Sequence, residues 1–234
     1  QNNVQGSCDM GSFPHELPGY RHVSDDGVRA IYDELWGVEV ADEPGLRIPN
    51  MFDSAIDGSF RALFVQGEDI AQSDPNTHHV QAALAALDLL VVQDLFVNET
   101  AKFAHVLLPG TSFLEKDGTF TNAERRINRV RPVMAPRTGK QEWEIVCEIA
   151  QAMGYPMAYD SAAQIMDEIA LTTPTFAGVS FEKLDRVGSV QWPCNDAAPE
   201  GTPIMHVGGF VRGKGKLVET VYVPTKERST RRFP

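Results

Sequence analysis

The sequence predicts an α/β fold in which helices cover both faces of a parallel sheet, followed by an irregular C-terminal extension. Three short apolar runs carry this prediction, at residues 63–66, 89–94 and 104–110. Segments with helical patterns separate the runs, and crossover helices bury both faces of parallel strands. The expected arrangement is a parallel Rossmann-like sheet, in which ligands bind at the loops that follow the carboxyl ends of the strands.

Charge and composition narrow the functional classes. The chain has 234 residues, enough for one sizeable core with a smaller appendage, and a net charge of −11. This charge argues against a nucleic acid partner, because a protein that binds phosphate backbones needs a basic face. The sequence has no apolar stretch near the roughly 20 residues of a membrane span and no signal-peptide pattern. We therefore expect a cytoplasmic protein without a membrane span.

Residues 1–60 are predicted to be a loop and helical lead-in to the α/β domain. Glycine and proline punctuate the first third of this region, which indicates irregular backbone. Ser24 can cap a helix that Gly37 ends, and a second short helix is expected over 49–56. The residues expected on the buried faces of these helices are Val28, Ile31, Leu35, Phe52 and Ile56. The sequence does not open on methionine, so we expect a piece of a longer protein.

Residues 61–171 are predicted to form the α/β domain itself. After the first strand, Ser73 and Asp74 can cap a helix that begins at Pro75. The polar segment 111–131 is expected to be a long functional loop or a hairpin. The basic side chains in and just after it either form a solvated face or bind an anion such as phosphate. These side chains are Arg125, Arg126, Arg129, Arg131 and Arg137.

Helical periodicity fades after residue 171. Before that point, one helix is expected over 142–153 and another after Ser161. Residues 172–234 are predicted to be an irregular excursion and a linker, because proline, glycine and asparagine multiply there. Within this region the alternating run 217–223 indicates a strand.

The ends of the three predicted strands offer carboxylates, amides and hydroxyls. These residues are Asp69 and Ser73 after the first strand, Gln93 and Asp94 at the second, and Thr111 and Ser112 after the third. A carboxylate accepts hydrogen bonds from paired N–H donors, so Asp69 or Asp94 could hold the edge of a guanine, with Gln93 completing the plane. The alternative is that these residues only cap helices. Without a phosphate-binding glycine loop, a nucleophile–base pair or a metal-binding pair, the residues alone indicate an α/β ligand-binding domain.

Several motifs, in the same order along the chain, resemble the molybdopterin oxidoreductase superfamily. They lie at residues 2–11 (NNVQGSCDMG), 66–69 (QGED), 73–75 (SDP), 91–96 (VVQDLF), 99–101 (ETA), 106–109 (VLLP), 115–126 (EKDGTFTNAERR) and 143–145 (WEI). The opening motif and the later run 191–194 (QWPC) are most similar to the catalytic alpha subunit of molybdenum- or tungsten-dependent formate dehydrogenase. A nitrate reductase or respiratory-complex relative is the alternative within the superfamily, and a cofactor-free structural or interaction domain is the alternative outside it.

The resemblance implies a cofactor, bis-molybdopterin guanine dinucleotide with molybdenum or tungsten. It implies that Asp69, Ser73 and Gln93 bind one guanine dinucleotide and that the opening loop lies beside the pterin and the metal. The positions that it marks as cofactor-binding are Gln1, Asn2, Asn3, Gly67, Asp69, Ser73, Gln93, Asp94, Gly110, Thr111 and Glu142. Two of them depart from the family pattern, since Gly110 replaces a serine or threonine and Glu142 replaces an aspartate.

The resemblance also implies where the catalytic chemistry lies. The family's catalytic subunit has an iron–sulfur domain, two α/β domains and a C-terminal β-barrel, so this chain is expected to be one central α/β domain that stops where the barrel begins. The metal-ligating cysteine or selenocysteine and the iron–sulfur cysteines are not in this sequence, so no catalytic or metal-ligating residue is expected in it and the chain alone is predicted to be inactive. The implied partners are the rest of the catalytic subunit and iron–sulfur and flavin or NAD subunits, which would carry electrons from formate to NAD or another acceptor.

Overall fold

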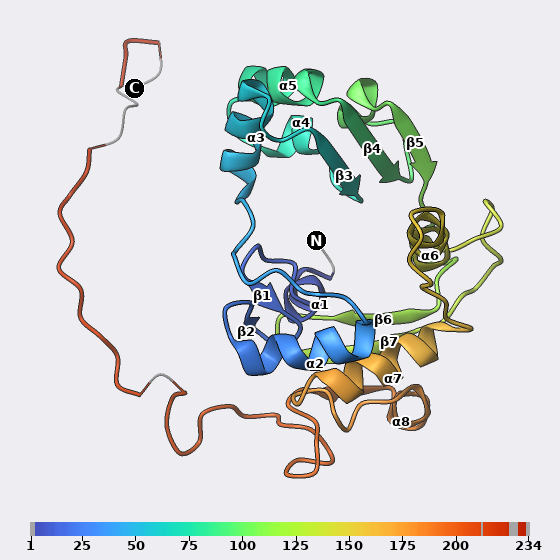
Figure 1. Ribbon diagram of the computed structural model, residues 1–234. Helices are drawn as coiled ribbons and strands as arrows, with labels where there is room; N and C mark the ends of the chain where they lie inside the picture. Colours follow the sequence, from blue (N-terminus) through green and yellow to red (C-terminus); the bar gives the residue numbers. More distant parts are fainter. Residues whose placement is uncertain (1–2, 212, 225–228, 233–234) are drawn as a thin grey trace. The chain divides into compact units, whose positions relative to one another are not determined.

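The computed structural model describes residues 3–211, 213–224 and 229–232. The chain divides into a first unit, Gln1–Thr202, and a second unit, Pro203–Pro234. All of the helices and strands assigned in the described residues belong to the first unit (Figure 1). Of the predicted site residues, Gln1 and Asn2 lie outside the described residues.

A three-stranded parallel sheet forms where the apolar runs predict it. Its strands are β3 (Ala62–Gln66), β4 (Leu89–Asp94) and β5 (Val106–Pro109), in the order β3-β4-β5. Gln66 pairs with Gln93, and Asp94 pairs with Pro109, so the carboxyl ends of the three strands meet at one edge. The predicted α/β class with a parallel sheet is confirmed.

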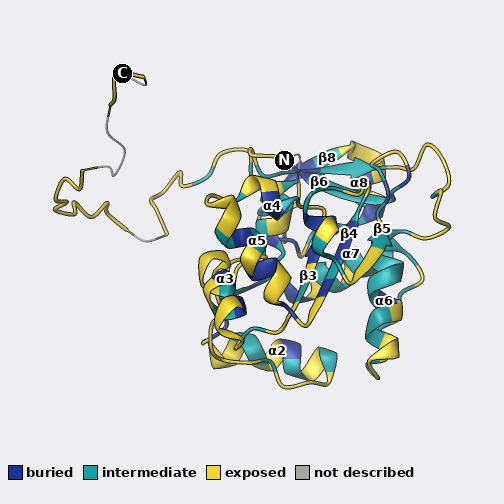
Figure 2. Ribbon diagram, turned by 90° about the horizontal axis from the view of Figure 1, so that it is seen from above, coloured by how far each residue is buried: buried dark blue, intermediate teal, exposed yellow. Residues whose placement is uncertain are grey.

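Helices cover one face of this sheet. They are α3 (Ile48–Asp57), α4 (Ile70–Ser73) and α5 (Thr77–Ala86), with the 3₁₀ helix η1 (Thr100–Phe103) beside them. Figure 2 shows buried residues where these helices meet the strands. The buried cluster consists of Phe52, Ala55, Val65, Ile70, Ala71, Val80, Ala83, Leu84, Leu87, Leu90 and Val92.

The opposite face of the sheet is less covered than the sequence predicts. Phe64, Leu89 and Val106 point away from the buried cluster and remain 44%, 43% and 42% exposed. Continuous apolar runs predict burial on both faces. In the residues that the structure describes, that burial is complete on one side only.

A second sheet, antiparallel and three-stranded, lies later in the chain. Its strands are β6 (Gly118–Thr121), β7 (Arg126–Val130) and β8 (Ser189–Gln191). The segment 111–131 therefore contains a hairpin, one of its two predicted forms. Helices α7 (Ala162–Thr172) and α8 (Phe181–Val187) pack on this sheet. Their buried cluster holds Ile127, Met166, Phe176, Val179, Phe181, Leu184, Val190 and Cys194.

The region after residue 171 is thus more regular than its composition predicts. Ser180 caps α8 by accepting a hydrogen bond from Lys183 N, and β8 adds to the hairpin as its third strand. Both elements are short, and prolines and glycines surround them, so periodicity could not show them. Irregular backbone without an assigned helix or strand is seen in the described residues of the second unit.

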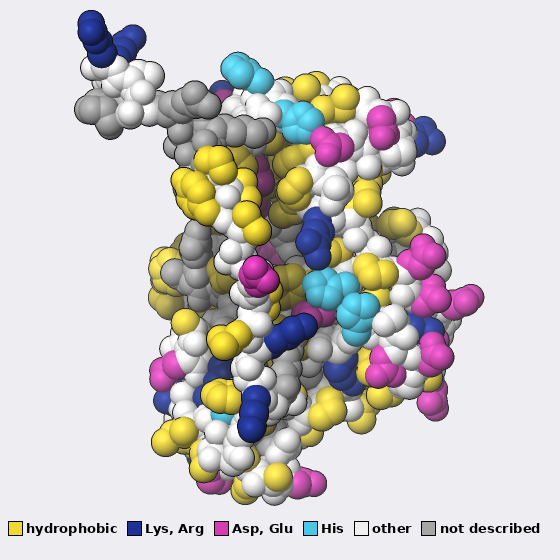
Figure 3. All heavy atoms as spheres, turned by 90° about the vertical axis from the view of Figure 1, so that its left-hand side faces the viewer, with side chains coloured by type: hydrophobic (Ala, Val, Ile, Leu, Met, Phe, Trp, Pro, Cys, Tyr) yellow, Lys and Arg dark blue, Asp and Glu magenta, His cyan; other side chains and the backbone are white. Residues whose placement is uncertain are grey.

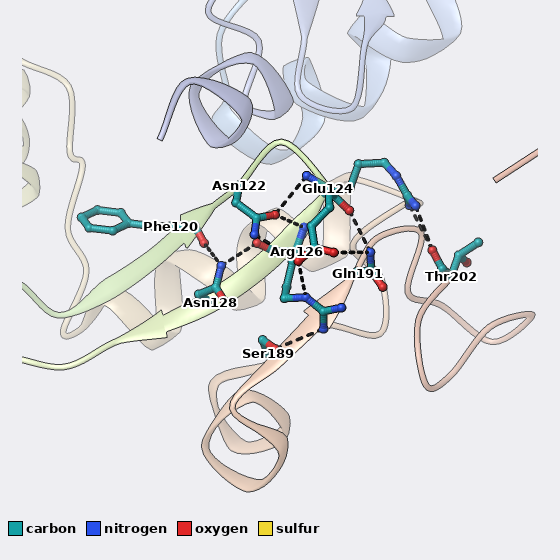
Figure 4. Close-up of polar contacts among 9 residues, drawn as sticks. Phe120, Asn122, Glu124, Arg126, Asn128, Ser189, Gln191 and Thr202 are labelled. Atoms are coloured by element: carbon teal, nitrogen blue, oxygen red, sulfur yellow. Dashed lines mark hydrogen bonds and ion pairs between the residues drawn. The ribbon is translucent and has the colours of Figure 1, made fainter. Parts of the chain in front are cut away.

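The arginines of the hairpin are engaged with neighbouring protein groups (Figure 4). Arg126 pairs with Glu124 at 2.8 Å and reaches Ser189 Oγ on β8. Arg125 donates to the carbonyl oxygen of Thr202, and Gln191 Nε2 donates to the carbonyl oxygen of Glu124. Arg129 pairs with two aspartates. These contacts join the hairpin to β8, to α8 and to the segment after β8, and they favour a structural role for the cluster over an anion site.

The lead-in region forms its own small cluster around Tyr32. It contains α1 (Val4–Asp9), β1 (Glu16–Leu17), β2 (Arg21–His22) and α2 (Asp26–Trp36). The end of α2 at Gly37, in the left-handed conformation, is as expected, but Asp25 rather than Ser24 caps its start. Ile31 and Leu35 are exposed, whereas Tyr32 is buried and its ring lies against that of Trp36 at a tilt of 49°. An aromatic pair at i, i+4 buries more surface than the aliphatic pair, which rotates the helix away from the predicted face.

Two further details differ from the sequence expectations. Ser73 and Asp74 do not cap a helix at Pro75; α4 occupies Ile70–Ser73, and α5 starts after Asn76, whose φ of 60° is left-handed. In α3 the buried residues are Phe52 and Ala55, whereas Ile56 is exposed. The segment 67–76 therefore contains a short helix and a left-handed residue, where the sequence predicts only a helix cap.

The second unit has bends and turns, but no assigned helix or strand, in its described residues. Residues 213–224 contain no assigned strand, so the strand predicted over 217–223 is wrong for these residues, and Leu217 is fully exposed. A strand needs a partner for its backbone groups, and this run has none among the described residues.

The longest helices assigned in the described ranges have 11 residues, too short to cross a bilayer, which takes about 20. On the face drawn in Figure 3, acidic side chains gather along the right-hand edge, whereas basic and hydrophobic side chains are interspersed over the rest. Within residues 3–211, 213–224 and 229–232, no group of three or more His, Cys, Asp or Glu side chains could hold a metal ion.

Candidate functional site

A pocket of about 600 Å³ lies at the carboxyl ends of the parallel strands. Loops after β3, β4 and β5 form one wall, and α1, β6 and the first residue of helix α6 (Glu142–Ala152) form the rest. The lining residues are Asn3, Val4, Ser7, Gln66, Gly67, Glu68, Gln93, Asp94, Leu95, Gly110, Thr111, Lys116, Phe120 and Glu142. A pocket of this size and place is what a parallel sheet offers to a nucleotide-sized ligand.

Gln93 gives this pocket an unsatisfied donor. Its side chain is 1% exposed, and its Oε1 accepts a hydrogen bond of 2.7 Å from Gln66 Nε2. Its own Nε2 is buried without a hydrogen-bond partner in the described part of the chain. Leaving such a donor unpaired costs roughly 1–3 kcal/mol, so the pocket favours a ligand with an acceptor at this point.

Glu142 gives the pocket a fixed carboxylate. Its Oε1 accepts from Thr111 N at 2.9 Å and lies 2.7 Å from Lys116 Nζ, while its Oε2 accepts from Thr111 Oγ1. Burial alone would raise the pKa of Glu142, but the hydrogen bonds from Lys116 and Thr111 outweigh it, and the pKa is lowered. The group is therefore an anion at neutral pH, able to accept further hydrogen bonds from a ligand.

The two glycines of the pocket have different reasons to be there. Gly67 follows β3 with a φ of 65°, a conformation that other residues rarely adopt, and its N–H donates to the carbonyl of Gln93. At Gly110 the limit is space, because an added Cβ would lie 3.0 Å from the carbonyl carbon of Asp94 and 3.2 Å from Leu95 N. This close approach explains why glycine stands where the resemblance leads one to expect serine or threonine.

Asn3 connects α1 to the hairpin at the pocket wall. Its Oδ1 accepts a hydrogen bond of 2.9 Å from Thr121 N on β6. The side chain folds back over Gly6, where an added Cβ would lie 2.3 Å from Asn3 Oδ1. Gly6 is therefore needed for Asn3 to reach the hairpin. The opening motif both lines the pocket and holds α1 against β6.

Asp69 and Ser73 lie apart from the pocket lining. Asp69 Oδ1 accepts from Thr100 N at 2.9 Å and from Thr100 Oγ1 at 2.7 Å, which ties the loop after β3 to η1. Burial opposes ionisation of Asp69, but these hydrogen bonds prevail and lower its pKa. Ser73 Oγ donates to Glu68 Oε1 at 2.6 Å. Both side chains stabilise the loop after β3 and do not line the pocket.

The structure thus brings together most of the predicted site. Seven predicted residues line the pocket, namely Asn3, Gly67, Gln93, Asp94, Gly110, Thr111 and Glu142. Asp94 is partly engaged, since it accepts from Leu95 N and Asn98 Nδ2. Sequence reasoning did not identify Gln66 and Lys116 as site residues. Gln66 is marked by its place at the end of β3, whereas nothing in the sequence shows which way Lys116 points.

Glu115, next to the pocket, organises the loop that carries Thr111. Its Oε2 accepts from Ser112 N and Oγ, and its Oε1 accepts from Arg137 N. These hydrogen bonds, with the Arg137 backbone first, lower the pKa of Glu115 from 4.5 to about 2.

We expect Glu115→Gln to unfold at a lower urea concentration than the wild type at pH 7. A folded-state pKa below the unfolded value adds stability above pH 4.5, and that stability is lost as the pH falls toward 2. The difference between the two urea midpoints should therefore shrink steadily between these pH values. A difference that stays constant with pH would contradict an ionised Glu115.

A smaller pocket of about 410 Å³ adjoins the first. It shares Gln66 and Glu142 with the larger pocket and is otherwise mostly apolar, with Trp143 and Cys147 in its wall. Trp143 Nε1 is buried without a hydrogen-bond partner in the described residues. Glu142 and Gln66 therefore stand between two cavities.

Comparison with known proteins adds independent findings. A family model described as molybdopterin oxidoreductase matches residues 2–152. The chain is 39% identical over its whole length to the F420-dependent formate dehydrogenase subunit alpha of Methanocaldococcus jannaschii, of which it covers 35%. It is 45% identical, over 92% of its length, to a putative formate dehydrogenase of Staphylococcus haemolyticus, of which it covers 22%. The chain therefore spans about a fifth to a third of the length of these relatives.

A solved structure adds a likeness of fold. Acetylene hydratase from Pelobacter acetylenicus matches 72% of this chain with a TM-score of 0.52 and 19% sequence identity, and the match covers 24% of that protein. At this identity the likeness concerns the fold alone.

Proposed function

The chain belongs to the molybdopterin oxidoreductase family, and we propose that it is the cofactor-binding α/β domain of a formate dehydrogenase catalytic subunit. The names of the relatives at 39% and 45% identity support the formate branch over a nitrate reductase or respiratory-complex relative. Family membership implies a molybdopterin cofactor with molybdenum or tungsten. That the cofactor takes the bis-guanine-dinucleotide form is part of the proposal.

The observation that carries the proposal is that one pocket is lined by both a donor, on Gln93, and an acceptor, on Glu142. Gln93 Nε2 is a buried donor without a partner in the described residues, and Glu142 is an ionised acceptor. A guanine presents an acceptor beside two N–H donors, so this donor and acceptor fit its edge.

Each residue has a defined part in this proposal. Gln93 and Glu142 hold the guanine, and Thr111 keeps Glu142 in place through two hydrogen bonds. Asn3 closes the wall through Thr121. Asp69, which the resemblance marks as a direct ligand, supports the loop through Thr100. When bound, the molybdopterin group supplies redox chemistry at its metal, whereas this chain binds and orients the group's nucleotide end.

The activity of the whole protein is also part of the proposal. We propose that it oxidises formate to carbon dioxide in the cytoplasm and delivers electrons through iron–sulfur centres to NAD or another acceptor. The catalytic residues and those centres would belong to parts outside this chain. The competing reading is a structural or interaction domain without cofactor, which would not bind a guanine nucleotide.

Calorimetric titration of the purified protein with GDP tests the proposal. We expect the wild type to bind, and Gln93→Met to bind at least about tenfold more weakly, because the variant loses the buried donor. Gln81→Met on α5, outside the pocket lining, is the matched control and should bind like the wild type. If the wild type gives no binding heat at any temperature tested, the cofactor-free reading is correct instead.

A further inference from the structure

The charged side chains that line the candidate pocket are acidic, with one exception. Glu68, Asp94 and Glu142 are among its lining residues, and Lys116 is the one basic residue among those described there. A nucleotide with a diphosphate brings two or more negative charges close to these carboxylates. Close anions repel strongly where water is partly excluded, so such a ligand needs a cation within the pocket.

The arginines of the hairpin do not provide that cation. Arg126 and Arg129 pair with carboxylates, and Arg125 donates to backbone carbonyls near β8. None of them is among the residues described as lining the pocket. Lys116 is therefore the basic side chain in position to meet a phosphate group.

Lys116 can move from its present partner to a bound phosphate. Its Nζ lies 2.7 Å from Glu142 Oε1, and the two side chains are 33% and 18% exposed. Leaving this half-buried carboxylate has a cost, which the attraction of Lys116 to a more highly charged diphosphate offsets. Glu142 keeps its two hydrogen bonds from Thr111 whether or not Lys116 stays. The lysine side chain has a flexible four-carbon stem and a compact charge, which suits a change of partner.

We propose that Lys116 binds the diphosphate of the nucleotide end of the ligand and that, in doing so, it releases Glu142. The freed Oε1 then accepts hydrogen bonds from the N–H donors of the base. The inference deepens the proposed function and rests on it. Lys116 thereby couples binding of the phosphates to binding of the base. When its ammonium group moves to the diphosphate, the Glu142 carboxylate is free to accept hydrogen bonds from the base.

The test compares three probes, GDP, guanosine and inorganic pyrophosphate, by calorimetric titration of the purified protein. We expect Lys116→Gln to weaken GDP binding about tenfold or more and to change guanosine binding by less than about threefold. Lys116→Arg should restore most of the GDP affinity, because it keeps the charge. The matched control is Lys140→Gln, since Lys140 pairs with Glu148 and is not described in the pocket lining.

A second variant tests the release of Glu142. Glu142→Gln removes the competitor for Lys116, so pyrophosphate should bind a few-fold more tightly, while guanosine should bind more weakly. A merely structural role of the Lys116–Glu142 pair would weaken both probes together.

The outcomes separate this inference from the proposed function. If the wild type binds GDP and Lys116→Gln binds it equally well, Lys116 does not hold the diphosphate and the inference fails alone. If Lys116→Gln loses guanosine and GDP in parallel, the lysine maintains the shape of the pocket and the inference is again wrong. If the wild type binds neither GDP nor guanosine, the proposed function fails and the inference fails with it.

Discussion

Replacement of Asp9 by alanine should lower the free energy of unfolding by about 3 kcal/mol, because it removes the buried carboxylate that three side-chain donors share as their acceptor. Asp9 is fully buried. Its carboxylate accepts hydrogen bonds from Gln5 Nε2 at 2.8 Å, from Tyr20 OH at 2.9 Å and from Trp192 Nε1 at 2.8 Å. These contacts join α1 to the segment after β1 and to the residue after β8.

Urea unfolding of the variant at pH 7 measures this loss. Asp42→Ala is the matched control, since Asp42 is exposed, and it should change the free energy of unfolding by less than about 0.5 kcal/mol. Equal midpoints for the two variants would mean that the network around Asp9 contributes nothing to stability.

The same carboxylate gives a pH dependence with a defined sign. Burial raises the pKa of Asp9, against hydrogen bonds from Gln5, Tyr20 and Trp192 that lower it. A folded-state pKa above the unfolded value stabilises the fold at low pH, and this contribution is lost as the pH rises through the folded pKa. Relative to the wild type, Asp9→Asn should therefore gain stability as the pH rises over that window. The opposite slope would show that the hydrogen bonds dominate burial.

The Asp9 network also bears on the pocket. Asn3 and Ser7 line the pocket from the same short helix that Asp9 ends. A helix of six residues is not stable by itself, so its position depends on such tertiary contacts. The network therefore helps to position the α1 side of the candidate pocket, although Asp9 itself is not among the described lining residues.

Local patterns predicted the parallel sheet and three of the residues that line the candidate pocket. The runs that became β3, β4 and β5 are apolar, short and bounded by turn residues, so their length and composition are sufficient to indicate strands. Strand direction then places Gln93, Asp94 and Thr111 at one edge, which the pocket confirms as a shared location. These inferences needed no knowledge of distant contacts.

The features that the sequence did not predict depend on distant partners. Asp69 is turned toward Thr100, 31 positions later, and no local pattern shows that pairing. The orientation of α2 depends on Tyr32, whose hydroxyl meets the Arg21 side chain. Lys116 reaches the pocket because the hairpin begins two residues later, at Gly118. In each case tertiary contacts choose between local options that the sequence leaves equally open.

The resemblance to a known family predicted residues that spacing alone could not. Glu142 lies 31 positions after Thr111, and only the family pattern marked it as part of the site. The structure bears on the first departure from that pattern, because a Cβ at Gly110 would lie 3.0 Å from the carbonyl carbon of Asp94, so a side chain there requires the neighbouring backbone to shift.

Replacement of Leu90 by alanine should lower the free energy of unfolding by about 3–4 kcal/mol, since it opens a cavity in the main core. Leu90 is fully buried in the middle strand, where it pairs with Leu63 of β3 and packs in the cluster formed with α3, α4 and α5. The neighbouring residue Leu89 is the matched control. It has the same side chain on the same strand, but it points to the opposite face and is 43% exposed.

The comparison of Leu90→Ala with Leu89→Ala, by urea unfolding, decides how the sheet is covered. If helices cover only the face seen to be buried, Leu89→Ala should cost less than about 1 kcal/mol, because little apolar area is withdrawn from water there. Similar losses for the two variants would instead mean that the sheet face carrying Leu89 is also covered in solution, as the continuous apolar runs predict. The exposed side of β4 is therefore where sequence and structure disagree in a way that one pair of variants can resolve.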